Sequence, residues 1–340
     1  MKPLVSILIP AYNAERFIGE TIRSALAQTW PSKEIIVVDD GSRDGTLEVA
    51  RRFASRSVQI VTQENQGAAA ARNRALALSQ GEYIQWLDAD DLLSVRKVER
   101  QVDALRDGGP RRLASSPWGY FRYRPSKVRL VPTVLWHDLD PLEWLLRKWE
   151  HNTHMQTATW LVSRQLSEAA GPWDSRLLGD DDGEYFTRVV VRSDGVRFIQ
   201  DERVYYRITD AARLSYIGAS PRKMDAQLLG MELQIGYVRA LQDSLRVRQA
   251  CLTYLDTWLI HFYPHRPDLV ERARQIAASL GGEIHKPRLS WKYDWIRQLF
   301  GWSAAERAQR RYNELKSRFL SRCDRALFQT LDRSIDVSQI

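Results

Sequence analysis

The chain has 340 residues, of which 44% are hydrophobic and 27% charged, a balance that supports a buried core and excludes a mainly disordered protein. Its 50 basic and 42 acidic residues give a formal charge of +8, but the basic residues are spread along the chain and form no nucleic-acid-binding motif. We therefore expect no nucleic-acid partner. The only cysteines, Cys251 and Cys323, have no Cys or His at metal-ligand spacing, so we predict two buried free thiols rather than a zinc site or a disulfide.

The first apolar segment, Leu4–Ile9, is too short for the core of a signal peptide and far too short to span a bilayer. No apolar run of about 18 residues, the length that a membrane span needs, occurs elsewhere in the sequence. We therefore predict a cytoplasmic protein.

Short β-branched-rich apolar segments alternate with helical patterns over the first 110 residues. The predicted strands are Leu4–Ile9, Glu34–Val38, Val58–Thr62 and Glu82–Leu87. The predicted helices are Glu15–Gln28, Thr46–Ala54 and Gly67–Ser79, the last with a cap at Gly81. This alternation predicts an α/β fold with right-handed crossovers and a mainly parallel sheet that carries helices on both faces.

The periodicity weakens from about residue 108 to residue 138, where we expect an irregular connection with short strands. The helices predicted next are Asp140–Lys148, Gln165–Ala170 and Gly179–Val191, and the short strands are Thr157–Ser163, Arg197–Gln200 and Arg203–Arg207. Long helices follow at Pro221–Leu245, Arg248–Phe262, Pro267–Leu280 and Ala304–Leu331. We predict a domain over residues 1–212, with a ligand-binding part (1–105) and a second part (106–212), and a helical C-terminal region over residues 213–340.

Ligands of such sheets bind beyond the carboxyl ends of the strands. The segments at those ends of the four predicted strands are Pro10–Asn13, Asp39–Ser42, Gln63–Gly67 and Asp88–Asp91. Several carboxylates at one sheet edge are costly unless a cation neutralises them. Mg²⁺ or Mn²⁺ suits oxygen ligands shared with a diphosphate. Asp90 or Asp91 also fits the N-cap of a following helix, so the pattern alone leaves both interpretations open.

The other strand ends are equally ambiguous when each is taken alone. Asp39–Ser42 fits a turn, or a carboxylate that accepts the imide N–H of a uracil or thymine ring. Tyr12 fits a ring stacked on a base, or an aromatic lid over the core. Arg72 fits a phosphate contact, or a surface residue of an Ala-rich helix.

Taken together, these segments resemble family 2 glycosyltransferases, whose nucleotide-binding domain has the GT-A fold. The matching stretches are Val5–Asn13, Ile36–Thr46, Asn65–Gly67 with Ala71–Asn73, and Asp88–Asp91, in the order and spacing of the family. The resemblance is strong over about residues 3–105, is weaker to about residue 210, and does not extend further. It implies a GT-A, Rossmann-like sheet followed by the helical C-terminal region.

Site residues follow from this resemblance, position by position. The implied donor-binding residues are Pro10, Ala11, Tyr12, Asp39, Asp40, Arg72, Asp88 and Ala89. Asp88 and Asp90 match the Asp-x-Asp motif of the family, and Asp90 is the expected direct ligand of Mn²⁺ or Mg²⁺. The segment Gly179–Arg188 resembles the acidic pair and Arg-bearing helix that supply the catalytic base, which places the base at Asp182 with Asp181 as its partner. Because Asp180 is a third acid next to this pair, the position of the base is open by one residue.

The resemblance implies an inverting transfer of one sugar from a nucleotide diphosphate sugar, expected to be a UDP-sugar, to a carbohydrate or lipid-linked hydroxyl acceptor. A carboxylate would take the proton of the acceptor while the metal stabilises the departing diphosphate. The chain lacks the Gln-x-x-Arg-Trp motif and membrane spans of processive members, which favours single-sugar transfer in surface polysaccharide or glycoconjugate synthesis. The alternatives are a non-catalytic binding module and, less favoured, a haloacid-dehalogenase-like phosphatase, whose Asp-x-Asp-Gly motif is absent.

Residues 286–302 combine aromatic, aliphatic and basic side chains, which are Lys286, Arg288, Trp291, Lys292, Trp295, Ile296, Arg297, Leu299, Phe300 and Trp302. This segment fits a peripheral contact with the inner face of a membrane, where lipid-linked acceptors reside. It also fits a C-terminal helix packed on the main domain, and we favour that interpretation.

Overall fold

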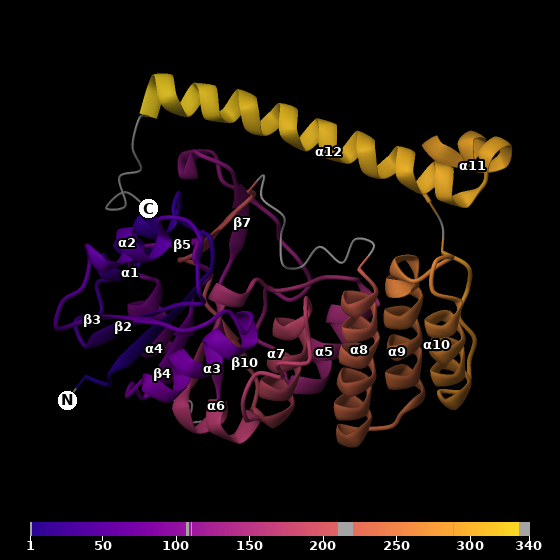
Figure 1. Ribbon diagram of the computed structural model, residues 1–340. Helices are drawn as coiled ribbons and strands as arrows, with labels where there is room; N and C mark the ends of the chain where they lie inside the picture. Colours follow the sequence, from indigo (N-terminus) through magenta and orange to yellow (C-terminus); the bar gives the residue numbers. More distant parts are fainter. Residues whose placement is uncertain (1, 107–108, 110, 210–219, 288, 333–340) are drawn as a thin grey trace.

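The computed structural model describes residues 2–106, 109, 111–209, 220–287 and 289–332, with side chains to residue 330. The predicted domain boundary near residue 212 and the predicted membrane-contact residue Arg288 lie outside these residues. An α/β part is followed by a helical C-terminal region, drawn in orange and yellow in Figure 1. This arrangement confirms the predicted fold class.

The main sheet has seven strands in the order β10-β6-β9-β4-β1-β2-β3. Its N-terminal strands are β1 (Val5–Ala11), β2 (Lys33–Asp39), β3 (Val58–Thr62) and β4 (Tyr83–Trp86). They pair with one another in parallel. All residues of β1 are buried, as expected for a central strand that is covered on both faces. The prediction of a mainly parallel sheet is therefore confirmed.

The crossovers between these strands are α1 (Ile18–Leu26), α2 (Thr46–Arg51) and α3 (Ala68–Leu78). The predicted cap at Gly81 is wrong, because α3 ends at Leu78 and its cap residue, Ser79, is extended. Gly81 instead lies against β1, where an added Cβ would come 2.5 Å from the backbone nitrogen of Ser6. The glycine is required by this close approach of two chain segments.

The second half of the α/β part completes the main sheet with short strands and adds a small one. β6 (Leu113–Ser115), β9 (Leu161–Ser163) and β10 (Val196–Phe198) extend the main sheet. β9 is antiparallel to both β4 and β6. The small sheet has the order β5-β11-β7-β8, with the strands β5 (Leu92–Leu93), β11 (Val204–Arg207), β7 (Trp118–Phe121) and β8 (Arg129–Leu130).

The helices of this half are α4 (Lys97–Leu105), α5 (Pro141–Glu150), α6 (Arg164–Ala170) and α7 (Asp181–Arg192). The sequence patterns did not predict α4. The predicted strand Thr157–Ser163 is also wrong over its first half, because Thr157–Thr159 form a 3₁₀ turn before β9 begins.

Three C-terminal helices, α8 (Pro221–Leu241), α9 (Leu245–Trp258) and α10 (Pro267–Ser279), stand side by side next to α7 in Figure 1. They are not a separate layer, since their buried residues belong to the same hydrophobic core as the main sheet. α8 packs directly on α7, and Trp149 of α5 stacks on Tyr254 of α9 at 4.9 Å.

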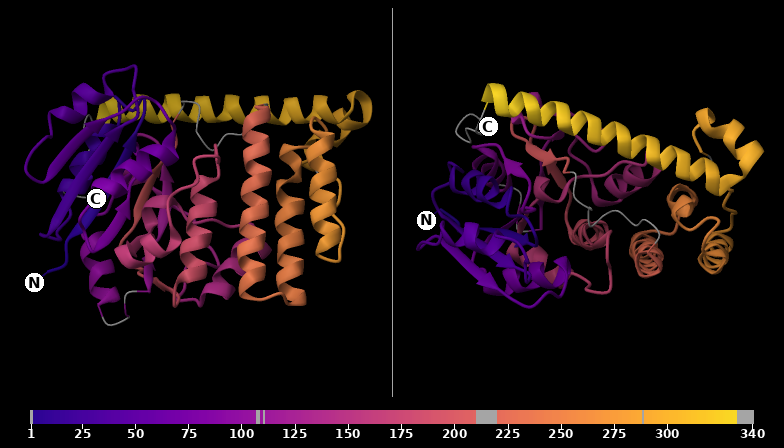
Figure 2. Two further views of the ribbon diagram at one scale, coloured as in Figure 1. Left: turned by 60° about the horizontal axis from the view of Figure 1, so that its bottom comes forward. Right: turned by 45° about the horizontal axis from the view of Figure 1, so that its top comes forward.

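The last described helices are α11 (Asp294–Phe300) and α12 (Trp302–Leu327), and α12 crosses one side of the molecule in all three views of Figures 1 and 2. The favoured interpretation, that the aromatic segment packs on the main domain, is wrong for most of its apolar side chains. Trp291, Trp295, Leu299 and Phe300 are exposed. Cys323 is also exposed, contrary to prediction, whereas Cys251 is buried. Among the described residues, none of the helices has the length and apolar character needed to cross a bilayer.

Candidate active site

A cavity of about 730 Å³, which we call the donor cavity, opens at the carboxyl ends of β1, β2 and β4. Ligands of open α/β sheets bind at this place. All predicted site residues except Asp39 line it, and they are Pro10, Ala11, Tyr12, Asp40, Arg72, Asp88, Ala89, Asp90, Asp181 and Asp182. The tertiary structure therefore brings together side chains from five separate segments of the chain.

Tyr12 follows β1 and is 46% exposed, so it is not a lid over the core. The loop around it is held by contacts between the ends of β1 and β2. The backbone N–H of Asn13 donates to Ser42 Oγ at 3.0 Å, and the Asn13 side chain accepts from the backbone of Arg43 at 2.9 Å. These bonds leave the ring of Tyr12 on the cavity wall, where it is available to a flat ligand.

The two acids at the end of β2 have different surroundings. Asp40 is buried, and its oxygens accept from Gln63 Nε2 and from the backbone N–H groups of Gln66 and Gly67, at 2.8–2.9 Å. Asp40 thus fixes the loop before α3. Asp39 accepts only through Oδ2, and its Oδ1 is buried without a partner among the described residues. A buried acceptor of this kind is completed by a water molecule or a ligand.

The acidic segment after β4 divides into residues that face the cavity and one that does not. Asp88 and Asp90 line the donor cavity. Asp91 is fully buried and accepts from Gln156 Nε2 at 2.5 Å and from the backbone N–H of Arg207 at 2.8 Å. Burial, together with the neighbouring Asp90 and Asp88, raises the pKa of Asp91 well above its usual range. The N-cap alternative is wrong, since α4 begins only at Lys97.

Arg72 of α3 lies at the centre of the site and is 5% exposed, so it is not a surface residue. Its guanidinium donates to Asp181 at 2.5 Å and to Asp88 at 3.0 Å, and it lies 4.4 Å from the ring of Trp173. Burial alone would lower the pKa of Arg72, but the Asp181 and Asp88 carboxylates outweigh it and raise the pKa. Arg72 therefore remains charged and links the two acidic segments.

The acidic triplet at the start of α7 is divided in the same way. Asp181 is buried and pairs with Arg72. Asp180 accepts from Gln234 Nε2 at 3.1 Å and from the Tyr254 hydroxyl at 3.4 Å. Burial raises the pKa of both Asp180 and Asp181 to about 6. Asp182 accepts from the Thr157 hydroxyl at 3.1 Å and lines the cavity.

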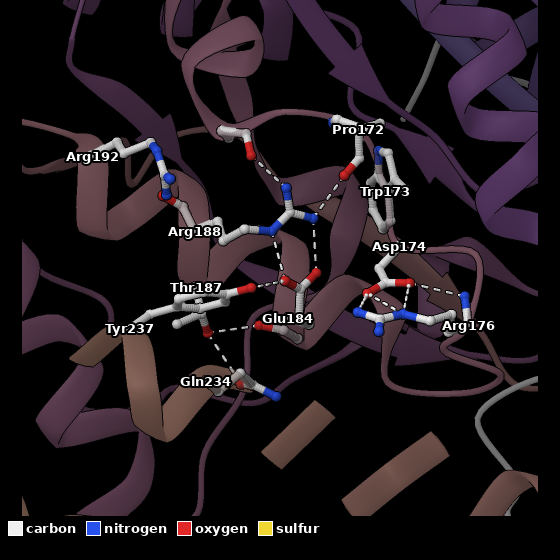
Figure 3. A network of polar contacts seen from close by, with 12 residues as sticks. Pro172, Trp173, Asp174, Arg176, Glu184, Thr187, Arg188, Arg192, Gln234 and Tyr237 are labelled. Carbon is white, nitrogen blue, oxygen red and sulfur yellow. Dashed lines mark hydrogen bonds and ion pairs between the residues drawn. The ribbon is translucent and has the colours of Figure 1, made fainter. Parts of the chain in front are cut away.

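The residues after the triplet form a supporting network, shown from close by in Figure 3. Arg188 donates to both carboxylate oxygens of Glu184, at 2.6 and 2.8 Å, and also to the carbonyl oxygens of Ala170 and Pro172. The Tyr237 hydroxyl of α8 donates to Glu184 at 3.0 Å. This network holds α7 against α8 and against the segment that carries Trp173, the residue whose ring lies against Arg72.

A second cavity of about 350 Å³ adjoins the first, and we call it the aromatic cavity. Asp88, Thr157, Gly179, Asp182 and Tyr206 line both. Its other aromatic walls are Tyr120, Trp144, Trp149, His154, Trp160, Phe186, Tyr254 and Trp258, and its polar groups include Lys148, Asn152 and Gln227. Of the two histidines in the segment before Met155, His154 lines this cavity and His151 is not among its walls.

Several residues that build the site were not predicted. They are Gln156, Thr157, Arg207, Gln234 and Tyr254. Each contacts an acid that lies at least 25 residues away in the sequence. No short-range pattern could have revealed them, because the pairing exists only in the folded chain.

The carboxylate oxygens of the site are of the kind that a divalent cation binds. The described residues contain no group of three or more Asp, Glu, His or Cys side chains arranged to hold a metal. Asp88 and Asp90 nevertheless present carboxylates to the donor cavity. Mg²⁺ and Mn²⁺ are commonly bound by one or two carboxylates, with the remaining oxygens coming from phosphate and water.

The sequence matches a known protein family. Residues 6–169 match the family described as glycosyl transferase family 2. TuaG of Bacillus subtilis, named as a teichuronic acid biosynthesis glycosyltransferase, is 41% identical over 109 residues, or 31% of this chain and 43% of TuaG. The uncharacterized glycosyltransferase EpsJ of Bacillus subtilis is 33% identical over 189 residues, or 54% of this chain and 53% of EpsJ. The match thus spans about half or less of these curated relatives.

Solved structures share the fold. TarS residues 1–349 of S. aureus, in complex with UDP-GlcNAc, superposes with a TM-score of 0.66 at 18% identity, covering 82% of this chain and 81% of that one. The mannosyltransferase PcManGT of Pyrobaculum calidifontis, in complex with GDP-Man and Mn²⁺, gives a TM-score of 0.51 at 21% identity, with 82% and 81% covered. At these identities the likeness concerns the fold alone.

Proposed function

Because the chain belongs to glycosyltransferase family 2, we propose that it transfers a single sugar from a UDP-sugar to a hydroxyl acceptor with inversion at the sugar carbon. One observation carries this proposal: the donor cavity and the aromatic cavity meet at Asp182. A donor in the first cavity and an acceptor in the second would both reach the same carboxylate. The proposed setting is surface polysaccharide or glycoconjugate synthesis, in line with the name of TuaG.

The donor cavity supports a nucleotide diphosphate through three features. Tyr12 offers an exposed ring for the base, and Asp39 retains an unpaired buried oxygen close to the cavity-lining Asp40. Asp88 and Asp90 would hold Mn²⁺ or Mg²⁺, which neutralises charge on the departing diphosphate when bound. The UDP-GlcNAc of TarS and the Mn²⁺ of PcManGT make a UDP-sugar and a divalent cation the first ligands to test.

Among the three acids of α7, the contacts favour Asp182 as the base. Asp181 lines only the donor cavity and is held by Arg72, and Asp180 lines only the aromatic cavity and is held by residues of α8 and α9. Asp182 accepts hydrogen bonds from the Thr157 hydroxyl and from the N–H of Gly183, both neutral donors. It lines both cavities. It would take the acceptor proton as the oxygen attacks C1 and as the bond from C1 to the diphosphate breaks.

The aromatic cavity supports a carbohydrate acceptor, because sugar rings pack their C–H faces on aromatic side chains while their hydroxyls need polar partners. Tyr120, Tyr206 and Trp258 supply such faces, and Lys148 and Asn152 supply polar groups. The identity of the sugar acceptor and any lipid carrier are left to experiment. A cytoplasmic location stays a prediction.

Two other functions are less favoured. A haloacid-dehalogenase-like phosphatase carries its nucleophile in an Asp-x-Asp-Gly motif at a strand end, and neither Asp39–Gly41 nor Asp88–Asp91 forms that motif. A non-catalytic binding module would not need an acid at the junction of two cavities. Loss of turnover in Asp182→Asn, with nucleotide binding retained, would separate catalysis from binding.

Calorimetry with UDP, in the presence and absence of Mn²⁺, tests the donor assignment. We expect metal-dependent binding by the wild type and a loss of at least about tenfold in Asp90→Asn, which removes one cation ligand. Asp103→Asn on the exposed side of α4 is the matched control and should bind as the wild type does. If wild-type protein binds neither UDP nor TDP when Mn²⁺ is present, the donor assignment is wrong.

A further inference from the structure

Beyond its first turn, where Trp302 packs on Tyr263 and Ala305 is buried, helix α12 contacts the body of the protein through its polar face. Ser317 and Ser321 accept from the guanidinium of Arg122, at 3.3 and 2.6 Å. Asp324 pairs with Arg124 at 2.7 Å, and Glu306 lies 3.2 Å from His265. Surface helices of globular proteins usually bury their apolar side and expose their polar side. In α12 this usual orientation is reversed.

The apolar face of α12 points away from the body. Tyr312, Leu315 and Phe319 recur with helical spacing and are 57%, 66% and 66% exposed. Leu320 and Leu327 extend the face and are also exposed. An apolar stripe of this length on the surface indicates a binding partner, since monomeric proteins rarely display one.

A row of arginines borders this apolar face. Arg307, Arg311, Arg318 and Arg322 are exposed and recur at intervals of four and seven residues, which places them on one flank of the helix. α11 and the turn before it continue the surface with Trp291, Trp295, Leu299 and Phe300, all exposed, and with the exposed Lys292 and Arg297. We call these residues of α11 and α12 together the outer face.

This chemistry matches the surface of an anionic bilayer. Amphipathic helices that lie at the membrane interface combine Trp, Phe and Leu on one side with Lys and Arg beside them. Tryptophan rings are enriched at the level of the lipid headgroups, and each basic residue gains from nearby anionic lipid. Aliphatic stems of arginine can lie along acyl chains while the guanidinium reaches the phosphates.

Pairing of two copies through α12 fits less well. In a two-fold antiparallel pair, each flank of one helix faces the same flank of the other, so the arginine row would lie beside a second arginine row. Like charges at such positions are destabilising. Lipid phosphates, in contrast, neutralise the row.

We propose that the outer face of α11 and α12 docks the protein on an anionic membrane surface. Docking would bring the site near the lipid, since α12 lies beside the donor cavity. Arg207 lines the donor cavity and also a smaller cavity beneath the C-terminal end of α12, together with Arg325 and Phe328. This inference stands apart from the donor assignment, because it concerns residues outside both site cavities.

Flotation of the full-length protein with vesicles tests the proposal. We expect recovery with equal amounts of phosphatidylcholine and phosphatidylglycerol, little recovery with phosphatidylcholine alone, and release by added salt. Leu315→Ser/Phe319→Ser and, separately, Arg318→Gln/Arg322→Gln should each lower partitioning at least about tenfold. The matched controls Leu241→Ser/Leu245→Ser and Arg51→Gln/Arg56→Gln change exposed residues of the same types elsewhere and should partition as the wild type does.

Melting temperatures and solution mass without lipid separate the outcomes. The replaced side chains are exposed, so the variants should melt close to the wild type. Recovery that is equal with neutral and anionic vesicles, or unchanged in both double variants, overturns the proposal. A wild-type dimer that Leu315→Ser/Phe319→Ser converts to monomer, without vesicle binding by the wild type, would assign the outer face to a second copy instead. UDP binding, measured separately, reports on the donor cavity and not on this face.

Discussion

Three adjacent aspartates at the start of α7 have three different environments. Asp180 is held by Gln234 and Tyr254 from the C-terminal helices, Asp181 by Arg72, and Asp182 by the hydroxyl of Thr157. Successive residues of a helix are rotated by about 100° from one another, so neighbouring side chains point in different directions. Of the three, only Asp182 lines both cavities.

Replacing Asp182 with Asn should strongly lower turnover while UDP binding is retained. An amide cannot accept the acceptor proton, and the loss of a positioned base costs about 10²- to 10⁴-fold in rate. Release of UDP during turnover and calorimetric UDP binding give the two measurements. Asp103→Asn is again the control. Full activity in Asp182→Asn, together with loss of activity in Asp181→Asn, would assign the catalytic base to Asp181 instead.

The half-buried Asp180 should make stability depend on pH. Burial raises the pKa of Asp180 to about 6, above the value of about 4 in an unfolded chain. The folded state therefore binds the proton more tightly, so this stabilising contribution is complete below about pH 4 and is lost as the pH rises through about 6. Relative to Asp180→Asn, the wild type should lose about 1–3 kcal/mol of unfolding free energy between pH 4 and pH 7.

Urea unfolding of both proteins across this pH range provides the measurement. Asp181 titrates in both proteins, so its contribution largely cancels in the difference. A difference between the two that does not change with pH would mean that Asp180 stays ionised in the folded protein.

At the scale of elements, the join between β1 and β4 depends on a residue without a side chain. Gly81 precedes β4 and lies against the backbone of β1, where a methyl group would come 2.5 Å from Ser6 N and 2.9 Å from Leu4 O. Ser6 belongs to the buried central strand β1 and Leu4 directly precedes that strand, so these backbone atoms cannot move aside easily. The position of β4 also sets the position of Asp88, which follows it.

Gly81→Ala should therefore lower the free energy of unfolding by about 1–3 kcal/mol through overpacking. Gly236→Ala is a matched control, for which we expect the free energy of unfolding to rise instead of fall. Gly236 lies within α8, and an added Cβ there meets nothing within 4 Å. Alanine at this position should stabilise the protein by about 0.5–1 kcal/mol, because it restricts the unfolded chain. Equal effects of the two substitutions, measured by urea unfolding, would contradict this account.

For the whole molecule, the C-terminal helices belong to two groups. α8 and α9 share the core of the α/β part and supply partners for Asp180. α11 and α12 make mainly polar contacts at the surface and expose their apolar side chains. A chain truncated at the predicted boundary near residue 212 would lack both groups of helices.

A chain ending at residue 212 should lack a cooperative unfolding transition. It would expose the faces of α5 and α7 on which α8 and α9 pack, including Trp149, and leave Asp180 without its partners. A chain ending at residue 285 removes only α11 and α12 and should unfold cooperatively. Calorimetric melting of both chains gives the measurement. A chain of residues 1–212 that melts as the full protein does would support an independent domain there.

Local patterns were sufficient to predict the parallel strands and the acids at their ends. The period of apolar residues specifies each strand and helix, and parallel strands place their carboxyl ends on one side, so Tyr12, Asp88 and Asp90 had to lie near one another. The resemblance to a family added the position of Asp182. All but one of the predicted site residues line one cavity.

Tertiary structure alone decided which partner each of these acids has. Asp40, Asp91 and Asp181 look alike in the sequence, yet backbone N–H groups bind Asp40, Gln156 binds Asp91 and Arg72 binds Asp181. Those partners come from distant segments, and hydrogen bonding between distant segments leaves no periodic trace in a sequence. The direction of α12 was decided in the same way. An amphipathic pattern specifies two faces, but only contacts with the rest of the chain determine which face turns inward, and here it is the polar one.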